Sequence, residues 1–398
     1  MPASPPRPQA SARAGEFRLA QDGPDGFWAF HPRPLPPDPP LRVDVAMQTL
    51  LDRANQALGR LDGVTLLLPD PDQFIYTFVR KEAVLSSQIE GTQSSLSDLL
   101  LFEHDAAPGV LIEDAGETAN YIAALNHGLA QITRPGAPPL SARLLREVHA
   151  RLLRSGRGAR KAPGEFRRTQ NWLGGSRPGL ARFVPPPAPE VPPAIAALER
   201  FIHDEPQPTP ILIKAALAHA QFETIHPFLD GNGRVGRLLI TLLLCSEGVM
   251  RRPLLYLSLF FKRRREDYYA HLERVRTDGD WEGWLRFFLE GVIEVAESTT
   301  HTTRRLVALI ESDRRAIHSF GRGAATAHRM HDLAARFIVL GASSAAEQLE
   351  LTSPPVYAAI DRLEQAGILR EATGRRRGKL YVYDKYLAIL GEGTEPEE

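Results

Sequence analysis

Apolar residues recur at helical spacing along most of this chain. Residues 43–64 place their apolar side chains on one stripe, formed by Val45, Leu50, Leu51, Ala54, Leu58 and Leu61. An apolar stripe with a period of 3.6 residues is typical of an α-helix packed on a core. The same pattern returns in residues 77–91, 117–132, 141–154, 190–205, 210–225 and 235–248, with further helices to about residue 309. The sequence therefore predicts a mostly α protein.

Two segments break this pattern. Residues 156–193 cluster Gly, Pro and Arg, which favours a loop and a short β-hairpin over residues 171–184. Residues 331–390 predict a helix, a turn, a second helix capped by Ser353, and a basic strand pair. The second helix has a buried stripe of Val356, Ala359, Ile360 and Leu363. We therefore expect a helical core with a β-hairpin flap, and a small α+β winged-helix domain.

A chain of 398 residues predicts two or three domains. Eleven prolines in the first 40 residues suggest a flexible arm. The expected order is a Pro-rich arm (1–40), an N-terminal helical region (41–125), a core (126–300), a linker helix (301–330), a winged helix-turn-helix (331–390) and an acidic tail (391–398).

Charge and composition exclude some classes of protein. Lys+Arg and Asp+Glu both number 48, which argues against general affinity for nucleic acids or membranes. The single cysteine excludes an intrachain disulfide. We find no N-terminal signal core and no apolar stretch near the ~20 residues that span a bilayer. We therefore expect a cytoplasmic protein with no membrane partner.

The most chemically dense stretch is HPFLDGNGRVGR, residues 226–237, between two helical patterns. Pro227 disfavours the α conformation at His226, so the preceding helix should end there. Two Gly-containing turns follow, and a helix begins near Arg234. A tight turn before a helix N-terminus directs N–H groups and the positive end of the dipole into one concavity, which suits phosphate. Arg234 and Arg237 share one helix face and add positive charge.

The side chains of this stretch suit phosphate chemistry. Histidine is the ordinary base at neutral pH, so His226 is a candidate general base. Asp230 could hold Mg²⁺ against phosphates, and Phe228 would anchor the loop as an apolar plug. Asp-Gly and Asn-Gly are also hairpin-turn signals, so a purely structural loop is the alternative. The helical flanks favour the anion site.

The stretch closely resembles the signature HPFxDGNGRxxR of the Fic (Fido) family and matches it at every specified position. That family transfers AMP from ATP to a hydroxyl group of a protein. The resemblance implies that His226 is the general base and Asp230 the Mg²⁺ ligand. It also implies an ATP site that comprises Asp230, Gly231, Asn232, Gly233, Arg234, Gly236 and Arg237, with Arg237 on the γ-phosphate.

A second stretch, LSSQIEGT, gains meaning beside that signature. Many Fic proteins have an inhibitory helix with the pattern (S/T)xxxE(G/N), which Ser86, Glu90 and Gly91 match. In the family this glutamate pairs with the second arginine of the signature, here Arg237, and so displaces the γ-phosphate. The alternatives are a capping box from Ser87 to Glu90, or a helix that ends at Gly91.

Two further features follow from the resemblance. Residues 171–184 occupy the place of the family's flap, which can dock an extended target segment by strand addition. Tyr269 is a candidate for packing on adenine, although a tyrosine on a helix face can equally belong to the core. The predicted second helix of the winged domain has almost none of the Arg, Asn or Gln side chains that read bases. Nucleic acid and protein are both open as partners of this helix.

These features predict a protein adenylyltransferase that uses ATP and Mg²⁺ and is autoinhibited in cis by Glu90. Its expected partners are ATP, a target protein with a Ser, Thr or Tyr acceptor, the chain itself by auto-AMPylation, and a second copy in a homodimer. One alternative is a DNA-binding transcriptional regulator with a nucleotide-sensing Fic core. The other is a Fic enzyme that removes AMP, with Glu90 positioning a water molecule.

Overall fold

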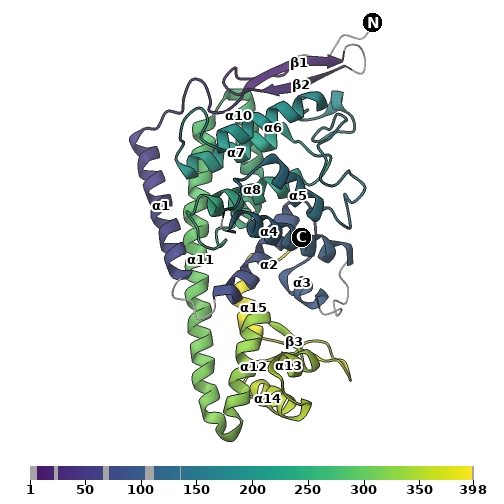
Figure 1. Ribbon diagram of the computed structural model, residues 1–398, viewed down its shortest axis with the longest axis vertical. Helices are drawn as coiled ribbons and strands as arrows, with labels where there is room; N and C mark the ends of the chain where they lie inside the picture. The colour runs from purple at the N-terminus through teal and green to yellow at the C-terminus, as the bar shows by residue number, and fades with distance from the viewer. Residues whose placement is uncertain (1–6, 22–25, 66–70, 104–111, 135, 397–398) are drawn as a thin grey trace. The chain divides into compact units, whose positions relative to one another are not determined.

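The computed structural model describes residues 7–21, 26–65, 71–103, 112–134 and 136–396 (Figure 1). The chain divides into two compact units. The first comprises Met1–Gly59 and Asn120–Val295, and the second Arg60–Ala119 and Ala296–Glu398. Helices dominate both units, and the described residues also form two small antiparallel sheets. The predicted fold class is confirmed. Three helices contribute to both units: α1 (Val45–Thr65), α4 (Ile112–Ile132) and α11 (Trp281–Ile317).

The core of the first unit is the helix pair α7 (Ile211–Ile225) and α8 (Asn232–Ser246). Every residue of α7 after the first is buried, including the polar Lys214, His219 and Glu223. Its neighbours are α6 (Val191–Ile202) and α10 (Arg265–Asp278), while α5 (Ala142–Leu152) packs on α8. The short α9 (Ser258–Arg263) precedes α10. The loop between α7 and α8 is therefore held from several sides.

The N-terminal arm differs from the prediction. The strands β1 (Gly15–Gln21) and β2 (Phe27–Pro32) pair as an antiparallel hairpin, and β2 also contacts α7. Phe30 is fully buried, its ring lies 5.1 Å from that of Phe17, and its N–H donates to the carbonyl of Val184 at 2.9 Å. Almost all the prolines that suggested flexibility lie outside the two strands. A flexible arm over residues 1–40 was thus wrong for this hairpin, since its aromatic residues anchor it.

The hairpin predicted over residues 171–184 is shorter than expected. Its only regular pairing among the described residues is an antiparallel bridge from Leu173 to Phe183. The 3₁₀ turn η1 (Pro178–Leu180) fills the tip, and η2 (Ala188–Glu190) follows it. Gly175 has a φ of +74°, and a Cβ there would lie 2.3 Å from the carbonyl oxygen of Leu180. This glycine-dependent turn ends the pairing early.

In the second unit, α2 (Pro71–Ile89) packs against α3 (Leu96–Phe102), α12 (Ala324–Phe337) and α15 (Asp384–Gly391). The segment after α15 also contacts α2. The ammonium of Lys81 donates to the carbonyl of Glu392, and the amide of Gln88 to that of Thr394, both at 2.8 Å. Thr394 is buried, so this part of the predicted tail is packed on the unit.

The remaining elements of this unit follow the predicted order. The 3₁₀ turn η3 (His318–Gly323) leads into α12, and α13 (Ala342–Leu349) and α14 (Ser353–Gln365) form the helix, turn, helix. The buried stripe of α14 is the predicted one. Its N-cap, however, is Thr352, so Ser353 is already in the helix. Prolines at the first helical positions fix this start, because their φ is already helical.

The predicted strand pair is β4 (Arg370–Glu371) and β5 (Leu380–Val382). A third strand, β3 (Val339–Gly341), pairs with the other edge of β5, so the order is β3-β5-β4. Three residues are too few for a detectable period, which is why this strand was missed. No helix formed by the described residues is long and apolar enough to cross a membrane.

Candidate active site

His226 lies where α7 ends. Its backbone is left-handed, with φ 49° and ψ 61°, and its N–H donates to the carbonyl of Phe222 at 2.9 Å. Such a residue closes a helix, but the conformation costs a non-glycine residue about 1–2 kcal/mol. Pro227 excludes the helical conformation, as predicted, and the tertiary structure selects the left-handed one.

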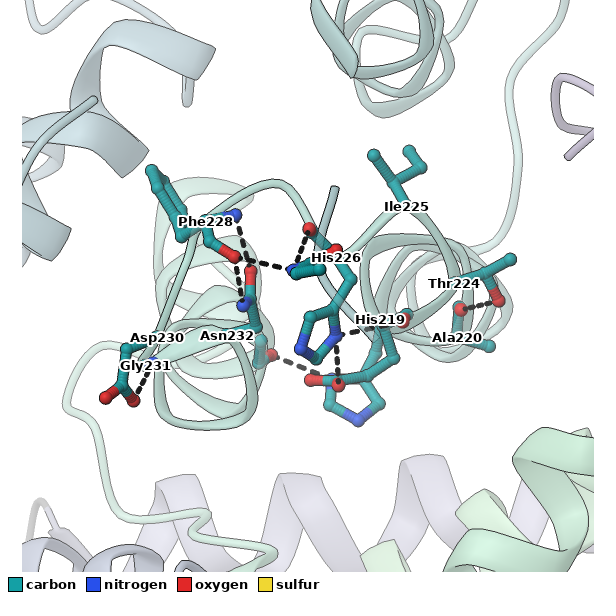
Figure 2. A network of polar contacts seen from close by, with 12 residues as sticks. His219, Ala220, Thr224, Ile225, His226, Phe228, Asp230, Gly231 and Asn232 are labelled. Carbon is teal, nitrogen blue, oxygen red and sulfur yellow. Dashed lines mark hydrogen bonds and ion pairs between the residues drawn. The ribbon is translucent and has the colours of Figure 1, made fainter. Parts of the chain in front are cut away.

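The imidazole of His226 lies between the end of α7 and the start of α8 (Figure 2). Its Nδ1 is 3.4 Å from the carbonyl oxygen of Glu223 and 4.0 Å from that residue's carboxylate. Oxygen acceptors favour a proton on Nδ1, which leaves the lone pair on Nε2. That is the state a general base requires.

The loop is closed by Asn232, which is buried. Its side chain accepts a hydrogen bond from the N–H of Phe228 at 2.8 Å and donates one to the carbonyl of the same residue at 2.9 Å (Figure 2). Both ends of the amide are thus used within the loop. Gly231, with φ +75°, is the N-cap of α8. The first helical turn, which includes Gly233, offers backbone N–H groups to an anion.

Two arginines of α8 supply positive charge. Arg234 and Arg237 are 1% and 3% exposed, so both guanidinium groups are held inside the unit. Gly236, between them, faces α7 and has a packing role. A Cβ at that position would lie 2.4 Å from a carboxylate oxygen of Glu223. The absence of a side chain at Gly236 thus allows α7 and α8 to approach each other closely.

Asp230 lies at the outer rim of the loop. One carboxylate oxygen accepts from the N–H of Gly231 at 2.6 Å and lies 3.7 Å from the guanidinium of Arg234. The residues that the structure describes include no group of three or more side chains that could hold a metal ion. A single carboxylate suits Mg²⁺, which takes the rest of its ligands from substrate phosphates and water. The residues present therefore fit a metal that arrives with the nucleotide.

His149, on α5, supports the loop and was missed by sequence reasoning. Its ring stacks on Phe228 with centroids 3.7 Å apart and an angle of 8°. Nδ1 accepts from the N–H of Gly164 at 2.8 Å, so Nε2 donates to the carbonyl of Asp230 at 3.0 Å. Burial lowers the pKa of His149 to about 4, and the ring is therefore neutral at pH 7. The only sequence signal was a histidine on the apolar face of a predicted helix.

A second buried histidine joins the helices behind the site. The Nε2 of His219 accepts from the hydroxyl of Tyr268 at 2.8 Å, and its Nδ1 donates to the carbonyl of Gly236 at 2.8 Å. Tyr268 is therefore a core residue. Tyr269, the predicted adenine contact, is half-buried on α10, with its ring 5.0 Å from that of Tyr268. No pattern in the sequence indicated the role of His219.

The second motif lies at the end of α2, in the second compact unit. Ser86 and Ser87 are fully buried in the last turn of the helix, so Ser87 cannot cap a helix start. The capping-box alternative was wrong. Glu90 follows the helix directly, and Gly91, with φ +97°, reverses the chain. The alternative of a helix that ends at this glycine is confirmed, and it is compatible with an inhibitory role for Glu90.

Two regions of the chain match models of known families. Residues 48–130 match the model described as Fic/DOC family N-terminal, and residues 139–244 match the model described as Fic/DOC family. The second match contains the loop with His226 and the first contains Glu90. Together they include both motifs that carried the resemblance.

Individual proteins agree. The chain is 33% identical over 128 residues to the protein adenylyltransferase Fic of Drosophila yakuba, and 32% identical to that of Drosophila melanogaster. Each match covers 32% of this chain and 23% of the relative, so the chain spans about a quarter of the length of these relatives.

Among solved structures, a Fic family protein from Desulfovibrio desulfuricans has a similar fold. Its TM-score is 0.55 at 20% identity, over 86% of this chain and 97% of that one. A Fic domain containing signaling protein from Bacteroides thetaiotaomicron has a TM-score of 0.50 at 19% identity, over 63% and 97%. These likenesses concern the fold alone. Residues 48–130 and 139–244 of this chain are therefore similar to the two Fic/DOC family domains.

Proposed function

We propose that this protein is an adenylyltransferase that transfers AMP from ATP to a hydroxyl side chain of a target protein and of itself. The observation that carries the proposal is the loop from α7 to α8. Within twelve residues it combines an imidazole whose Nδ1 faces the carbonyl of Glu223, a helix N-terminus and two buried arginines. The names of the Drosophila relatives support the same reaction class.

Each step has a residue that suits it. Nε2 of His226 removes the proton from the target hydroxyl, whose oxygen then forms a bond to the α-phosphorus. The bond between the α- and β-phosphates breaks, and pyrophosphate leaves. The first-turn N–H groups of α8 and the guanidinium of Arg234 stabilise charge on the α- and β-phosphates, and Arg237 binds the γ-phosphate. Tyr269 is our candidate for the adenine contact.

Mg²⁺ fits this scheme through Asp230. The carboxylate lies at the rim of the loop, beside the N-terminus of α8, where it could hold the ion that arrives with ATP. Such an ion would neutralise phosphate charge and orient the leaving group.

We further propose that Glu90 restrains the reaction in cis. The carboxylate would pair with Arg237 and so occupy the cation that the γ-phosphate needs. Its position directly after the last turn of α2, with Ser86 buried in that turn, supports this role.

Substitution of the base tests the proposed function. In a Glu90→Gly background, which removes the proposed restraint, His226→Ala should reduce transfer of label from ATP at least ~100-fold, since general base catalysis contributes 10²–10⁴. ATP binding should change little, because the phosphate site lies on α8. His203→Ala is the matched control: His203 closes α6 as His226 closes α7, yet it bonds to Leu140. Undiminished transfer by His226→Ala would remove this residue from the mechanism.

A further inference from the structure

Arg167 is a buried guanidinium close to the proposed base. It lies in the loop that precedes the flap and is only 3% exposed. Burial lowers its pKa to about 10, so the group remains charged at neutral pH. A buried charge requires strong compensation. Its side-chain hydrogen bonds go to backbone carbonyl oxygens.

Two of those four carbonyls belong to the end of α7. The Nε donates to the carbonyl of His226 at 3.0 Å and an Nη to that of Ile225 at 3.4 Å, while the Arg167 backbone N–H donates to Pro227 at 2.9 Å. The same Nη also donates to the carbonyl of Pro186, and the other Nη donates to that of Thr169 at 3.3 Å. One residue therefore binds three consecutive carbonyls around the proposed base.

This arrangement explains how His226 is held in an unfavourable backbone conformation. The left-handed conformation turns its carbonyl away from the helix, where a donor must receive it. Arg167 is the principal donor, and the amide of Asn171 adds a longer contact at 3.3 Å. A cation is also favourable here, because the last carbonyls of a helix carry partial negative charge. The direction of the imidazole depends on this backbone.

We propose that Arg167 is a positioning residue for the general base: its guanidinium fork fixes the left-handed turn at His226 and thereby aims the imidazole at the target hydroxyl. This inference rests on the proposed function of His226. Arg167 itself acts only through the backbone and does not contact the nucleotide. Only arginine offers a planar fork of five donors, so lysine should preserve the charge without preserving the geometry.

The test uses the full chain in the Glu90→Gly background, with Arg167→Met and Arg167→Lys. Arg146→Met is the matched control. The side chain of Arg146 also donates to a backbone carbonyl in the loop that contains Arg167, that of Gly164 at 2.7 Å, but it does not contact His226. Auto-adenylylation rates against ATP concentration separate kcat from KM. Melting temperatures report folding. NMR of protein labelled with ¹³C-histidine reports the environment of the His226 ring independently of activity. The His226 resonance is assigned because it is absent from the spectrum of His226→Ala.

We expect Arg167→Met to lower kcat ~10- to 100-fold, because a displacement of about 1 Å costs up to 10²-fold, while KM for ATP changes less than about threefold. Arg167→Lys should be intermediate, and the His226 resonance should move in both variants but not in Arg146→Met. If Arg167→Met does not fold, Arg167→Lys alone tests the inference. A folded Arg167→Lys with the parental kcat and an unmoved resonance overturns the inference. A moved resonance in a chain without transfer activity would support positioning and contradict the proposed function instead.

Discussion

At the scale of single residues, the site depends on a histidine that must remain neutral. His149 accepts a hydrogen bond at Nδ1 from Gly164 and donates one from Nε2 to Asp230. Protonation of Nδ1 would place two hydrogens between this nitrogen and the backbone nitrogen of Gly164. It would also put a charge in the core. The same ring stacks on Phe228, the anchor of the loop. A change in the protonation of His149 therefore acts on the whole loop.

The pKa of His149 leads to a prediction about acid stability. Burial lowers it to about 4 in the folded chain, against 6.5 for an ordinary histidine. Below pH 6.5 the unfolded chain binds the extra proton, so the contribution of His149 to stability is complete above pH 6.5 and is lost as pH falls toward 4. Between pH 6.5 and 5 the loss should be about 2 kcal/mol.

Urea unfolding of the wild type and of His149→Gln at several pH values measures this contribution. His149→Gln should be less stable at pH 7 because it loses the stacked ring, but its free energy of unfolding should decline less from pH 6.5 to 5. His219, whose burial lowers its pKa to about 3, is present in both proteins, so the difference isolates His149. Equal declines in the two proteins would contradict the assignment.

At the scale of elements, chemistry is concentrated where helices begin and end. His226 closes α7, Gly231 opens α8, and Glu90 follows α2. Helix ends expose unpaired backbone groups and partial charges, which makes them suitable for anions at N-termini and for cations at C-termini. The close contact of α7 with α8 at Gly236 holds the first two of these ends together. The base and the anion site thereby share one rigid support.

The end of α2 can be tested with three variants. If Glu90 occupies Arg237, Glu90→Gly should raise auto-adenylylation up to ~100-fold, as expected where a competent ATP pose is populated at the 1% level. Arg237→Ala should not activate, because it removes the partner of the inhibitor and the phosphate ligand together. The double variant should therefore resemble Arg237→Ala. Initial rates at saturating ATP measure all three.

Glu90→Gln is the matched control for that series. It keeps the length of the side chain and the end of the helix, and it removes only the charge. Activation by Glu90→Gln would assign the restraint to an ion pair. Activation by Glu90→Gly alone would assign the restraint to the helix end. An unchanged rate in both folded variants would contradict the autoinhibition proposal.

At the scale of the whole molecule, α2 is bound by the last residues of the described chain. Lys81 and Gln88 donate to the carbonyls of Glu392 and Thr394. The carboxylate of Glu392 also accepts two hydrogen bonds at 2.8 Å from Arg305 of α11, although both side chains are largely exposed. The proposed inhibitory helix and the C-terminal segment thus belong to one compact unit.

A truncation after Gly391 tests this connection. It removes two hydrogen bonds to α2, and at about 1 kcal/mol each the helix should lose roughly 2 kcal/mol of local stability. Amide hydrogen exchange in α2 should accelerate ~30-fold. A truncation after Glu395 retains both carbonyls and serves as the control. Equal exchange in α2 of both truncated chains would show that the tail does not hold this helix.

Much of this architecture could be predicted from sequence, because the signals were local. Five of the seven helices predicted with bounds, α1 and α5 to α8, lie within three residues of those bounds, since a period of 3.6 residues is visible over ten or more positions. The stripe of α14 was predicted in full. Likewise, the loop from His226 to Arg237 contains its histidine, turn glycines and arginines within twelve residues. Short-range order of this kind needs no knowledge of the rest of the chain.

The tertiary structure alone decided what surrounds that loop. The left-handed backbone of His226, the fork of Arg167 and the stacked ring of His149 join residues separated by about 60 to 80 positions. The same is true of the N-terminal hairpin on the flap and of the tail on α2, which is more than 300 positions away. Such contacts leave no period or spacing in a single sequence, because burial and hydrogen bonding are satisfied only when distant segments meet. The sequence by itself determined which groups can act, and the packing decided how those groups are oriented and hydrogen-bonded.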